Sequence, residues 1–85
     1  MHKFIDELRG ARLELGLSRR QVQKDVGISR NYLTEVEKGQ YNLSIRYGII
    51  LCDYYGIDIN LFIDYKNHML LNEIEAVSKE LEISV

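Results

Sequence analysis

Apolar residues recur every three or four positions along most of the chain, which is the spacing of one buried face of an α-helix. Glycine interrupts this pattern at short intervals, and serine or aspartate follows most of the interruptions, as at the ends and starts of helices. The sequence has no proline, no Asn-Gly or Asp-Gly turn and no long alternating run typical of strands. We therefore predict an all-α fold of short helices joined by tight turns.

The interruptions divide the chain into five or six predicted helices. Ser18, with Gln21 three residues later, has the capping-box pattern that begins a helix. The turn that follows this second helix is only Gly27-Ile28-Ser29, and so short a turn makes two helices cross steeply, as in a helix-turn-helix unit. The predicted helices cover about residues 4–15, 19–26, 30–38, 45–55, 59–63 and 66–83.

Length and composition indicate one small domain. The chain has 85 residues, 46% of them hydrophobic and 28% charged, which is typical of a soluble globular protein. A domain of this size buries only about 60–65% of its unfolded surface, so it needs very good packing or a partner. No apolar run approaches the ~18 residues of a membrane span, and the N-terminus lacks the pattern of a signal peptide. The expected location is the cytoplasm.

Charge is distributed unevenly along the chain. The formal net charge of −2 is unfavourable for binding nucleic acid, but its distribution matters more than its sum. Residues 19–46 carry six bases and three acids, a net of +3, whereas residues 64–85 carry two bases and five acids, a net of −3. The middle of the chain is therefore the candidate surface for a polyanion.

The segment 17–63 resembles the helix-turn-helix family of the phage lambda and 434 repressors and their bacterial relatives, often called the Xre family. The matching features occur in the family's order along the chain. They are Leu17-Ser18 at a helix start, Val26 to Ser29 in the turn, Val36 to Gly39, Asn42 to Ser44, and Tyr55 to Ile57. The resemblance implies a five-helix lambda-repressor-like DNA-binding domain over residues 1–63. Residues 64–85 then form an additional amphipathic C-terminal helix, for dimerisation or packing.

The resemblance makes the helix at 30–38 a recognition helix, which enters the major groove of double-stranded DNA. A groove about 12 Å wide admits one helix, and its base edges carry a readable pattern of donors and acceptors. Arg30 suits guanine, Asn31 suits adenine, and Thr34 suits a thymine methyl group. Glu35 either accepts from cytosine or repels phosphate at wrong sites. These four residues are the predicted base contacts.

Phosphate contacts would fix the register of the protein on DNA. The candidates lie at helix starts and in the loop after the recognition helix: Arg19, Ser29, Tyr32, Lys38, Gln40, Asn42 and Arg46. We expect Arg20 and Lys24 to be solvated instead. The resemblance also implies a structural ion pair between Arg12 and Glu37, which would hold the recognition helix against the first helix.

Three positions depart from the family pattern. Tyr41 replaces a common basic residue of the loop, so we expect fewer loop contacts to phosphate. Gln23 stands where a small alanine lets two helices approach, so its amide must turn outward or the helix angle must shift. Gly48 stands where a leucine fills the core, and a mid-helix glycine costs about 1 kcal/mol relative to alanine. Another side chain, such as a tyrosine, would have to fill that gap.

Catalysis and cofactor binding are not expected. The sequence offers no glycine-rich phosphate loop, no nucleophile with its base, and no paired carboxylates. His2 and His68 have no partners at metal-ligand spacing, so we expect no metal site. Cys52 cannot form an internal disulfide, because it is the one cysteine, and we expect a buried inert thiol.

A dimer surface is expected on the fourth helix and the tail. The family frame assigns Ile45, Gly48, Leu51, Cys52 and Tyr55 to the core, which leaves a second apolar stripe on that helix. The tail offers a seam of two apolar residues per heptad, although it is equally well interpreted as folding back on its own domain. The expected interface residues are Tyr47, Ile50, Tyr54, Leu70, Ile74, Val77 and Leu81.

Together these features predict a bacterial or phage transcription regulator, a repressor or autoregulator, that binds palindromic operator DNA as a homodimer. Restriction-modification controllers, small phage repressors and antitoxins all fit this size. The alternative is an adaptor or antitoxin-type module of the same fold whose main partner is another protein. A partner such as a toxin or RNA polymerase is not identified by the sequence, and neither is the sign of control.

Overall fold

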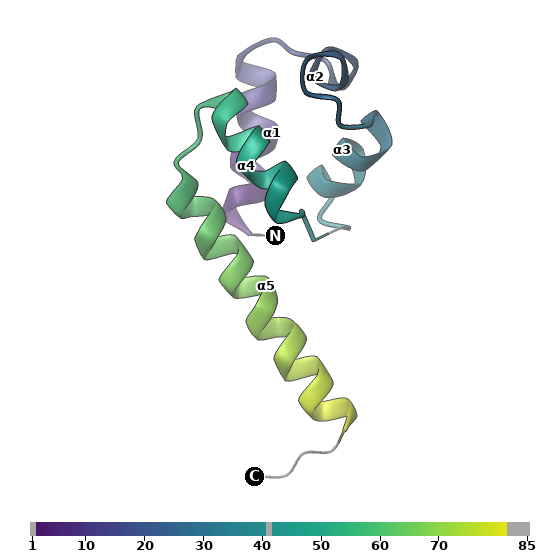
Figure 1. Ribbon diagram of the computed structural model, residues 1–85, viewed down its shortest axis with the longest axis vertical. Helices are drawn as coiled ribbons and strands as arrows, with labels where there is room; N and C mark the ends of the chain where they lie inside the picture. The colour runs from purple at the N-terminus through teal and green to yellow at the C-terminus, as the bar shows by residue number, and fades with distance from the viewer. Residues whose placement is uncertain (1, 41, 82–85) are drawn as a thin grey trace.

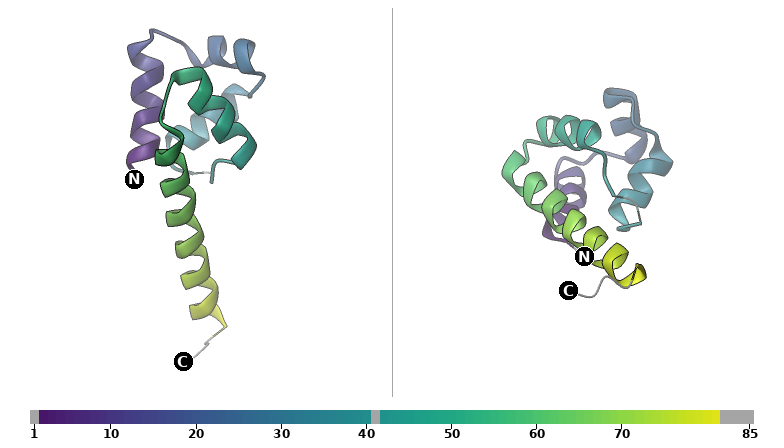
Figure 2. Two further views of the ribbon diagram at one scale, coloured as in Figure 1. Left: turned by 60° about the vertical axis from the view of Figure 1, so that its left-hand side comes forward. Right: turned by 60° about the horizontal axis from the view of Figure 1, so that its bottom comes forward.

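The computed structural model of the protein describes residues 2–40 and 42–81, and within these ranges it contains helices and no strands. The helices are α1 (Lys3–Glu14), α2 (Arg19–Val26), α3 (Arg30–Glu37), α4 (Ile45–Tyr55) and α5 (Ile59–Glu80). Helices α1 to α4 form one group, the first turns of α5 pack against α1 and α4 at its edge, and the rest of α5 projects from it as an arm (Figure 1). Two further views show the same arm standing clear of the other helices (Figure 2). The predicted all-α fold is confirmed.

Serine caps set the starts of the inner helices, as predicted. The side chains of Ser18, Ser29 and Ser44 each accept the backbone N–H of the residue three positions ahead. Such caps satisfy donors that a helix start otherwise leaves unpaired. At the other ends, Gly27 and Gly56 adopt left-handed conformations with φ of 77° and 71°, which close α2 and α4. Short helices with fixed ends result.

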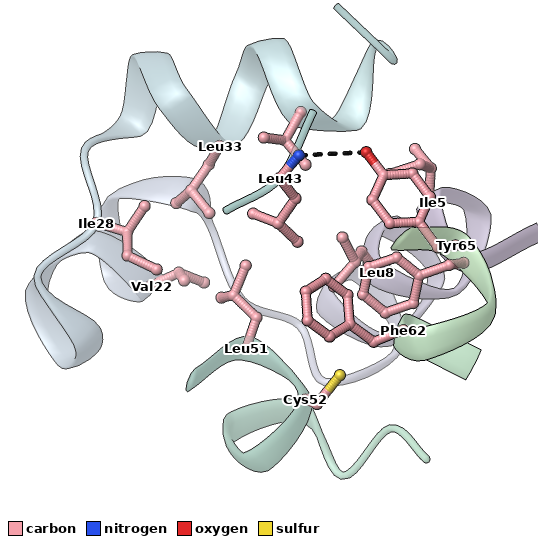
Figure 3. Packing of buried hydrophobic residues seen from close by; sticks show 12 residues of the cluster. Ile5, Leu8, Val22, Ile28, Leu33, Leu43, Leu51, Cys52, Phe62 and Tyr65 are labelled. Atoms are coloured by element: carbon pink, nitrogen blue, oxygen red, sulfur yellow. Dashed lines mark hydrogen bonds between the residues drawn. The ribbon is translucent and has the colours of Figure 1, made fainter. Parts of the chain in front are cut away.

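The core lies between α1, α2, α3, α4 and the first turns of α5 (Figure 3). It consists of Phe4, Ile5, Leu8, Val22, Ile28, Leu33, Val36, Leu43, Leu51, Cys52, Phe62 and Tyr65. The Tyr65 hydroxyl is satisfied inside this core, because it accepts the Leu43 N–H at 3.2 Å. Burial raises the pKa of the Cys52 thiol, which keeps it protonated.

The two helices predicted at the C-terminal end are one continuous helix. Helix α5 begins after Asp58, whose carboxylate accepts the Asn60 N–H, and runs for 22 residues. The predicted interruption between residues 63 and 66 is wrong because neither glycine nor proline stands there, and Tyr65 is a core residue. The apolar spacing changes there because the first apolar residues of α5 face the core, whereas the later ones lie on another face of the same helix. The division of the chain between residues 63 and 64 stays a prediction, and α5 crosses it without a break.

No helix in the described ranges combines the length and the apolar character needed to cross a membrane.

Gly48 is explained by an aromatic ring that occupies the place of its missing side chain. A Cβ atom built on Gly48 would overlap the ring of Phe62, which comes from α5. The gap predicted at this position is therefore filled by a phenylalanine rather than by a tyrosine. Because Phe62 is 3% exposed, it joins the first turns of α5 to the core through the space that the glycine leaves.

The predicted orientation of α4 is wrong in part. Ile45, assigned to the core, is 62% exposed, and Ile49 beside it is 51% exposed. Tyr47, Ile50 and Tyr54, assigned to an exposed stripe, are partly buried and pack against the core. The reason is that α4 contacts α1, α2 and α5, so that most of its circumference is covered.

Tyr47 and Tyr54 of α4 instead contact α3 and α2. The Tyr47 ring meets the Tyr32 ring of α3 edge-on, with their centroids 5.1 Å apart. The Tyr54 hydroxyl donates to Asp25 of α2, and this hydrogen bond raises the pKa of Tyr54 to about 12. A role for these side chains in a dimer stays an untested prediction.

The close fit at Gly48 predicts opposite effects for two glycine-to-alanine changes in helices. Gly48→Ala adds a methyl group where the Phe62 ring lies, and overpacking of this kind costs about 1–3 kcal/mol. Gly10→Ala, in α1, adds a methyl group with nothing within 4 Å, so it gains about 1 kcal/mol from helix propensity. Urea unfolding followed by circular dichroism measures both free energies of unfolding.

The double variant Gly48→Ala, Phe62→Leu tests the cause of the loss. A smaller side chain at position 62 makes room for the methyl group, so the second change should cost less in the Gly48→Ala background than alone. A Gly48→Ala variant as stable as the original protein would contradict the close fit.

Candidate nucleic-acid interface

Helices α2 and α3 are joined by a three-residue turn whose conformation is fixed at each position. Gly27 is left-handed, and its N–H donates to the Gln23 carbonyl at 2.8 Å. Ile28 is fully buried and anchors the turn in the core, and Ser29 caps α3. The direction of α3 relative to α2 is therefore set by the turn and by the core together.

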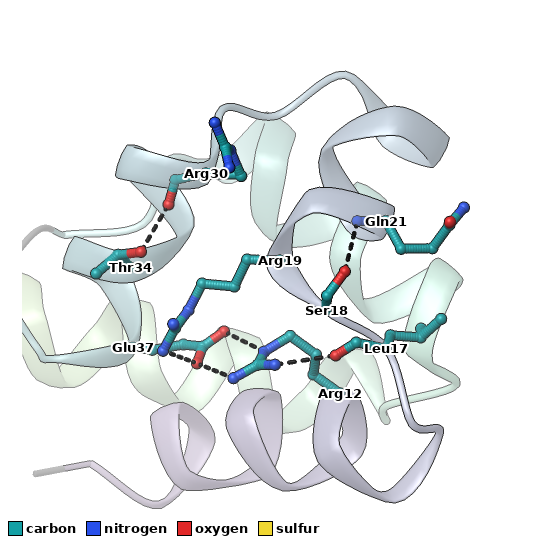
Figure 4. Close-up of polar contacts among 8 residues, drawn as sticks. All are labelled: Arg12, Leu17, Ser18, Arg19, Gln21, Arg30, Thr34 and Glu37. Carbon is teal, nitrogen blue, oxygen red and sulfur yellow. Dashed lines mark hydrogen bonds and ion pairs between the residues drawn. The ribbon is translucent and has the colours of Figure 1, made fainter.

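A buried carboxylate fixes α3 from its other end (Figure 4). Arg12 of α1 donates to Glu37 twice, from Nε to Oε2 at 2.9 Å and from Nη2 to Oε1 at 3.0 Å. The third nitrogen of Arg12, Nη1, donates to the Leu17 carbonyl at 2.9 Å. The hydrogen bonds with Glu37 raise the pKa of Arg12 above its ordinary value, so this guanidinium stays charged. The resemblance implied the pair of Arg12 and Glu37, and the structure brings the two residues together in this geometry.

Arg19, a predicted phosphate contact, joins the same ion pair. Its Nη2 donates to Glu37 Oε1 at 3.1 Å, and its side chain is 35% exposed. Sequence reasoning missed this contact, because a residue at the start of α2 gives no sign of which carboxylate the fold places beside it. A role for Arg19 at the DNA backbone stays a prediction.

Tyr55 lies near this ion pair as a partly buried, neutral group. Burial, and next the negative charge of Glu37, raise the pKa of Tyr55 to about 12. The hydroxyl therefore keeps its proton at neutral pH and adds no charge to the network of Glu37.

The first turn of α3 presents the predicted base contacts. Arg30 and Asn31 are exposed, whereas Thr34 and Glu35, one turn later, are partly buried. The Thr34 hydroxyl donates to the Arg30 carbonyl at 2.8 Å, so its proton is already used, and the methyl group is left for an apolar contact with a base edge. The exposed end of α3 thus carries a guanidinium and an amide side by side.

A basic groove runs between α2 and α3, with a volume of about 580 Å³. Its lining contains arginines and small polar groups but no carboxylate among the described residues: Arg12, Ser18, Arg19, Arg20, Arg30, Asn31 and Thr34. Arg20 was expected in solvent; it is exposed, and it also lines this groove next to Arg30. The groove offers positive charge to a phosphate beside the predicted base contacts.

Gln23 has a structural role that sequence reasoning missed. Its Oε1 accepts the Arg30 N–H at 3.0 Å, which is one of the unpaired donors at the start of α3. The side chain is exposed, and its amide reaches the start of α3 from the rim of the contact between the two helices. The signal in the sequence that could have predicted this role was a hydrogen-bonding side chain near the end of one helix, close to the start of the next.

The predicted contacts to the DNA backbone have diverse partners in the structure. The Ser29 side chain accepts the Tyr32 N–H as a cap, and the Tyr32 hydroxyl accepts the Ser44 N–H at 3.1 Å. Asn42 Oδ1 accepts from Lys66 Nζ at 2.9 Å. The remaining candidates are exposed: Lys38, Gln40 and Arg46.

The two histidines lie near each other, His2 at the start of α1 and His68 on α5. His2 Nδ1 accepts the Phe4 N–H and caps α1, and His2 Nε2 lies 3.2 Å from Asp64 Oδ2. The His68 ring lies 5.4 Å from the His2 ring. Within residues 2–40 and 42–81, no three histidine, cysteine or acidic side chains are grouped so that they could hold a metal ion.

A short turn anchored by the buried Ile28, a capped second helix with an exposed polar end, and a basic groove beside it are the features of a helix-turn-helix protein that binds DNA. The family model described as helix-turn-helix matches residues 8–62, and the chain belongs to this family of DNA-binding regulators, which are not generally enzymes. Comparison with curated proteins and with solved structures gives no significant match.

The network around Glu37 predicts a strong and non-additive effect on stability. Arg12→Met removes the main partner of a carboxylate that is 5% exposed, and breaking a buried pair in this way costs about 3–5 kcal/mol. The double variant Arg12→Met, Glu37→Leu leaves no uncompensated carboxylate and should recover most of that loss. Urea unfolding measures the free energies.

Arg9→Met is the matched control, because Arg9 is exposed on the same helix. It should change the free energy of unfolding by less than about 0.5 kcal/mol. A loss for Arg12→Met that is no larger than that for Arg9→Met would contradict a structural role for the ion pair.

Proposed function

We propose that this chain is a sequence-specific transcription regulator that binds a palindromic operator as a homodimer and represses by occupying a promoter. The observation that carries the proposal is the position of Arg30 and Asn31. They are exposed at the first turn of α3, on a helix that Glu37 holds from behind, and they border the basic groove. Side chains held in this way are suited to contact bases rather than only to be solvated.

The chemistry of these side chains assigns the base contacts. Arg30 donates to both acceptors of a guanine, and Asn31 donates to and accepts from an adenine. Thr34 presents its methyl group to a thymine, since its hydroxyl is held by the backbone. Glu35 accepts from a cytosine amino group or disfavours wrong sequences.

Phosphates would lie along the groove and the helix starts. The groove between α2 and α3 supplies Arg20 and Arg19, and Ser18 and Ser29 mark helix N-termini, whose N–H groups favour anions. Lys38, Gln40, Asn42 and Arg46 extend this set along the loop after α3 and the start of α4.

The small size of a single site supports a homodimer. One α3 contacts only a few base pairs, and repressors of this class bind two half-sites of a palindrome through two-fold symmetry. The chain offers exposed aliphatic surface for such an interface. It includes Ile45 and Ile49 of α4 and Leu70, Ile74, Val77 and Leu81 of α5.

The second candidate function is an adaptor whose main partner is another protein. The exposed apolar side chains of α5 favour it, because large exposed apolar patches mark interaction sites. An adaptor has no need of Arg30 and Asn31, so their contribution to DNA binding separates the two functions.

The decisive experiment is a titration of the protein against the DNA upstream of its own gene, at two salt concentrations, with an unrelated duplex as control. A regulator that controls its own gene binds the upstream DNA more tightly than the control at both concentrations. Equal and weak binding to both duplexes would favour the adaptor, and a pull-down would then identify its partner.

Arg30→Ala should weaken binding to the preferred sequence by about 1–3 kcal/mol and relax the preference at one base pair of each half-site. The physical reason is the loss of a two-pronged contact to guanine. Selection from randomised duplexes measures the preference. Lys24→Ala, an exposed change in α2 outside the groove, is the control and should leave the preference unchanged. Unchanged affinity of Arg30→Ala would remove Arg30 from the base contacts.

Arg20→Ala should weaken binding to every duplex by a similar factor. A phosphate contact carries no sequence information, and its loss reduces the slope of log Kd against log salt by about one. Titrations of the operator and the control duplex over a series of salt concentrations measure this slope. A loss confined to the operator would instead make Arg20 a base contact.

A further inference from the structure

Helix α5 has two different faces. Phe62 and Tyr65 lie on the face that packs into its own domain, with Leu61 and Met69 partly buried beside them. At about 3.6 residues per turn, a second set of apolar side chains lies roughly 130° around the helix from that face. This set, the α5 stripe, consists of Ile59, Ile63, Leu70, Ile74, Val77 and Leu81.

Every member of the α5 stripe is exposed. The exposed fractions run from 41% at Ile59 to 63% at Leu81. From Ile63 onward the stripe follows alternate spacings of four and three, with Asn67 at the one polar position. This is the a and d pattern of a two-stranded coiled coil.

The arm of α5 lacks tertiary support of its own. Beyond Met69 no residue of α5 belongs to the core or packs against it, among those that the structure describes. Isolated helices shorter than about 12–15 residues are marginal in water. The arm is therefore a segment whose helical state depends on what covers the α5 stripe.

The apolar surface continues from the α5 stripe onto α4. Ile49 and Ile59 line one groove, with a volume of about 450 Å³, at the junction of the two helices. Ile45 is exposed one turn before Ile49. The added surface matters, because the coiled-coil segment alone covers fewer than three heptads.

We propose that the α5 stripe is covered by the α5 stripe of a second copy of this chain, in a parallel, in-register pair of helices whose alignment is set by Asn67. This inference rests on the homodimer of the proposed function and specifies how the two copies meet.

Asn67 decides between the two possible directions. In a parallel pair it faces the same residue of the second copy, so the two amides satisfy each other, which is how a single a-position asparagine sets register. In an antiparallel pair that matches Leu70 with Ile74, Asn67 faces Val77. Its amide would then be covered without a partner, at the cost of an unsatisfied polar group.

Charges on α5 favour the same direction. The antiparallel pair would bring Lys66 near Glu80 of the second copy, but the Lys66 ammonium is already held by Asn42 and by the Leu43 carbonyl, each at 2.9 Å. The same arrangement would bring Glu73 close to Glu73 of the second copy, and the two negative charges would repel each other. A parallel pair avoids both problems and places both helix-turn-helix units at one end of the coil, where they can share one duplex.

Single cysteines on α5 test the direction without DNA. Leu70→Cys and Ile74→Cys are oxidised mildly, separately and as an equal mixture, and are separated on a non-reducing gel. We expect each variant alone to give a disulfide-linked dimer. Glu75→Cys, on another face of α5, is the control and should stay uncrosslinked. Cys52 does not interfere, because it is 3% exposed and its thiol pKa is raised.

Three other outcomes would overturn the proposal, each in a distinct way. Crosslinks that form only in the mixture would show an antiparallel pair. Sedimentation of a dimer that forms no crosslink at position 70 or 74 would place the interface elsewhere and leave the homodimer of the proposed function standing. A monomeric original protein would contradict both the pair and the homodimer, while the DNA titration would still decide whether the chain binds DNA.

Asn67→Ile tests the register role in a second way. The change completes an apolar seam, so we expect a higher Tm together with species larger than a dimer, because the restriction on oligomeric state is lost. Asn72→Ile, on another exposed face of α5, is the matched control and should alter neither property in this way. Unchanged Tm and a strict dimer for Asn67→Ile would contradict the assignment of Asn67 to the seam.

Discussion

The Glu37 carboxylate is the interaction on which the arrangement of the helix-turn-helix unit depends. It joins three helices, because Arg12 comes from α1, Arg19 from α2 and Glu37 itself from the end of α3. Desolvation makes such a carboxylate costly unless its oxygens are fully used, and here both are. As a consequence, the end of α3 is fixed in one position in the domain. The exposed residues at the start of α3 are therefore held on a rigid helix.

The start of α3 is held by independent means. The buried Ile28 fixes the turn, and Gln23 binds the first backbone N–H group of the helix. With the Glu37 network at the far end, α3 is secured at both termini while Arg30 and Asn31 remain exposed. A helix secured in this way contributes little conformational entropy cost on binding, which is the general advantage of a preorganised surface.

The helices and their caps were predictable from the sequence because they depend on local chemistry. Serine caps, glycine ends and the three-and-four spacing act over a few residues. The side of α4 that faces solvent was not predictable, since several other helices compete for an almost wholly apolar segment, and Ile45 was assigned wrongly for that reason. The fit of Phe62 into the space at Gly48 and the contact of Arg19 with Glu37 are likewise long-range. Among the site residues, the order of the base contacts along α3 could be predicted from the family pattern. The groove between α2 and α3 could not, because its lining depends on how the helices pack.

The root of α5 is tied to the loop before α4 through side chains on adjacent positions. Tyr65 binds the N–H and Lys66 the carbonyl of Leu43, and Lys66 also binds Asn42. Whatever orients the arm of α5 therefore also orients the loop that leads from α3 into α4. Linkage is reciprocal: if pairing of two arms eases the fit of the loop to a phosphate, occupancy by DNA strengthens the pairing by the same factor. Assembly and operator binding in this small chain would then form a single cooperative equilibrium, whose midpoint depends on protein concentration.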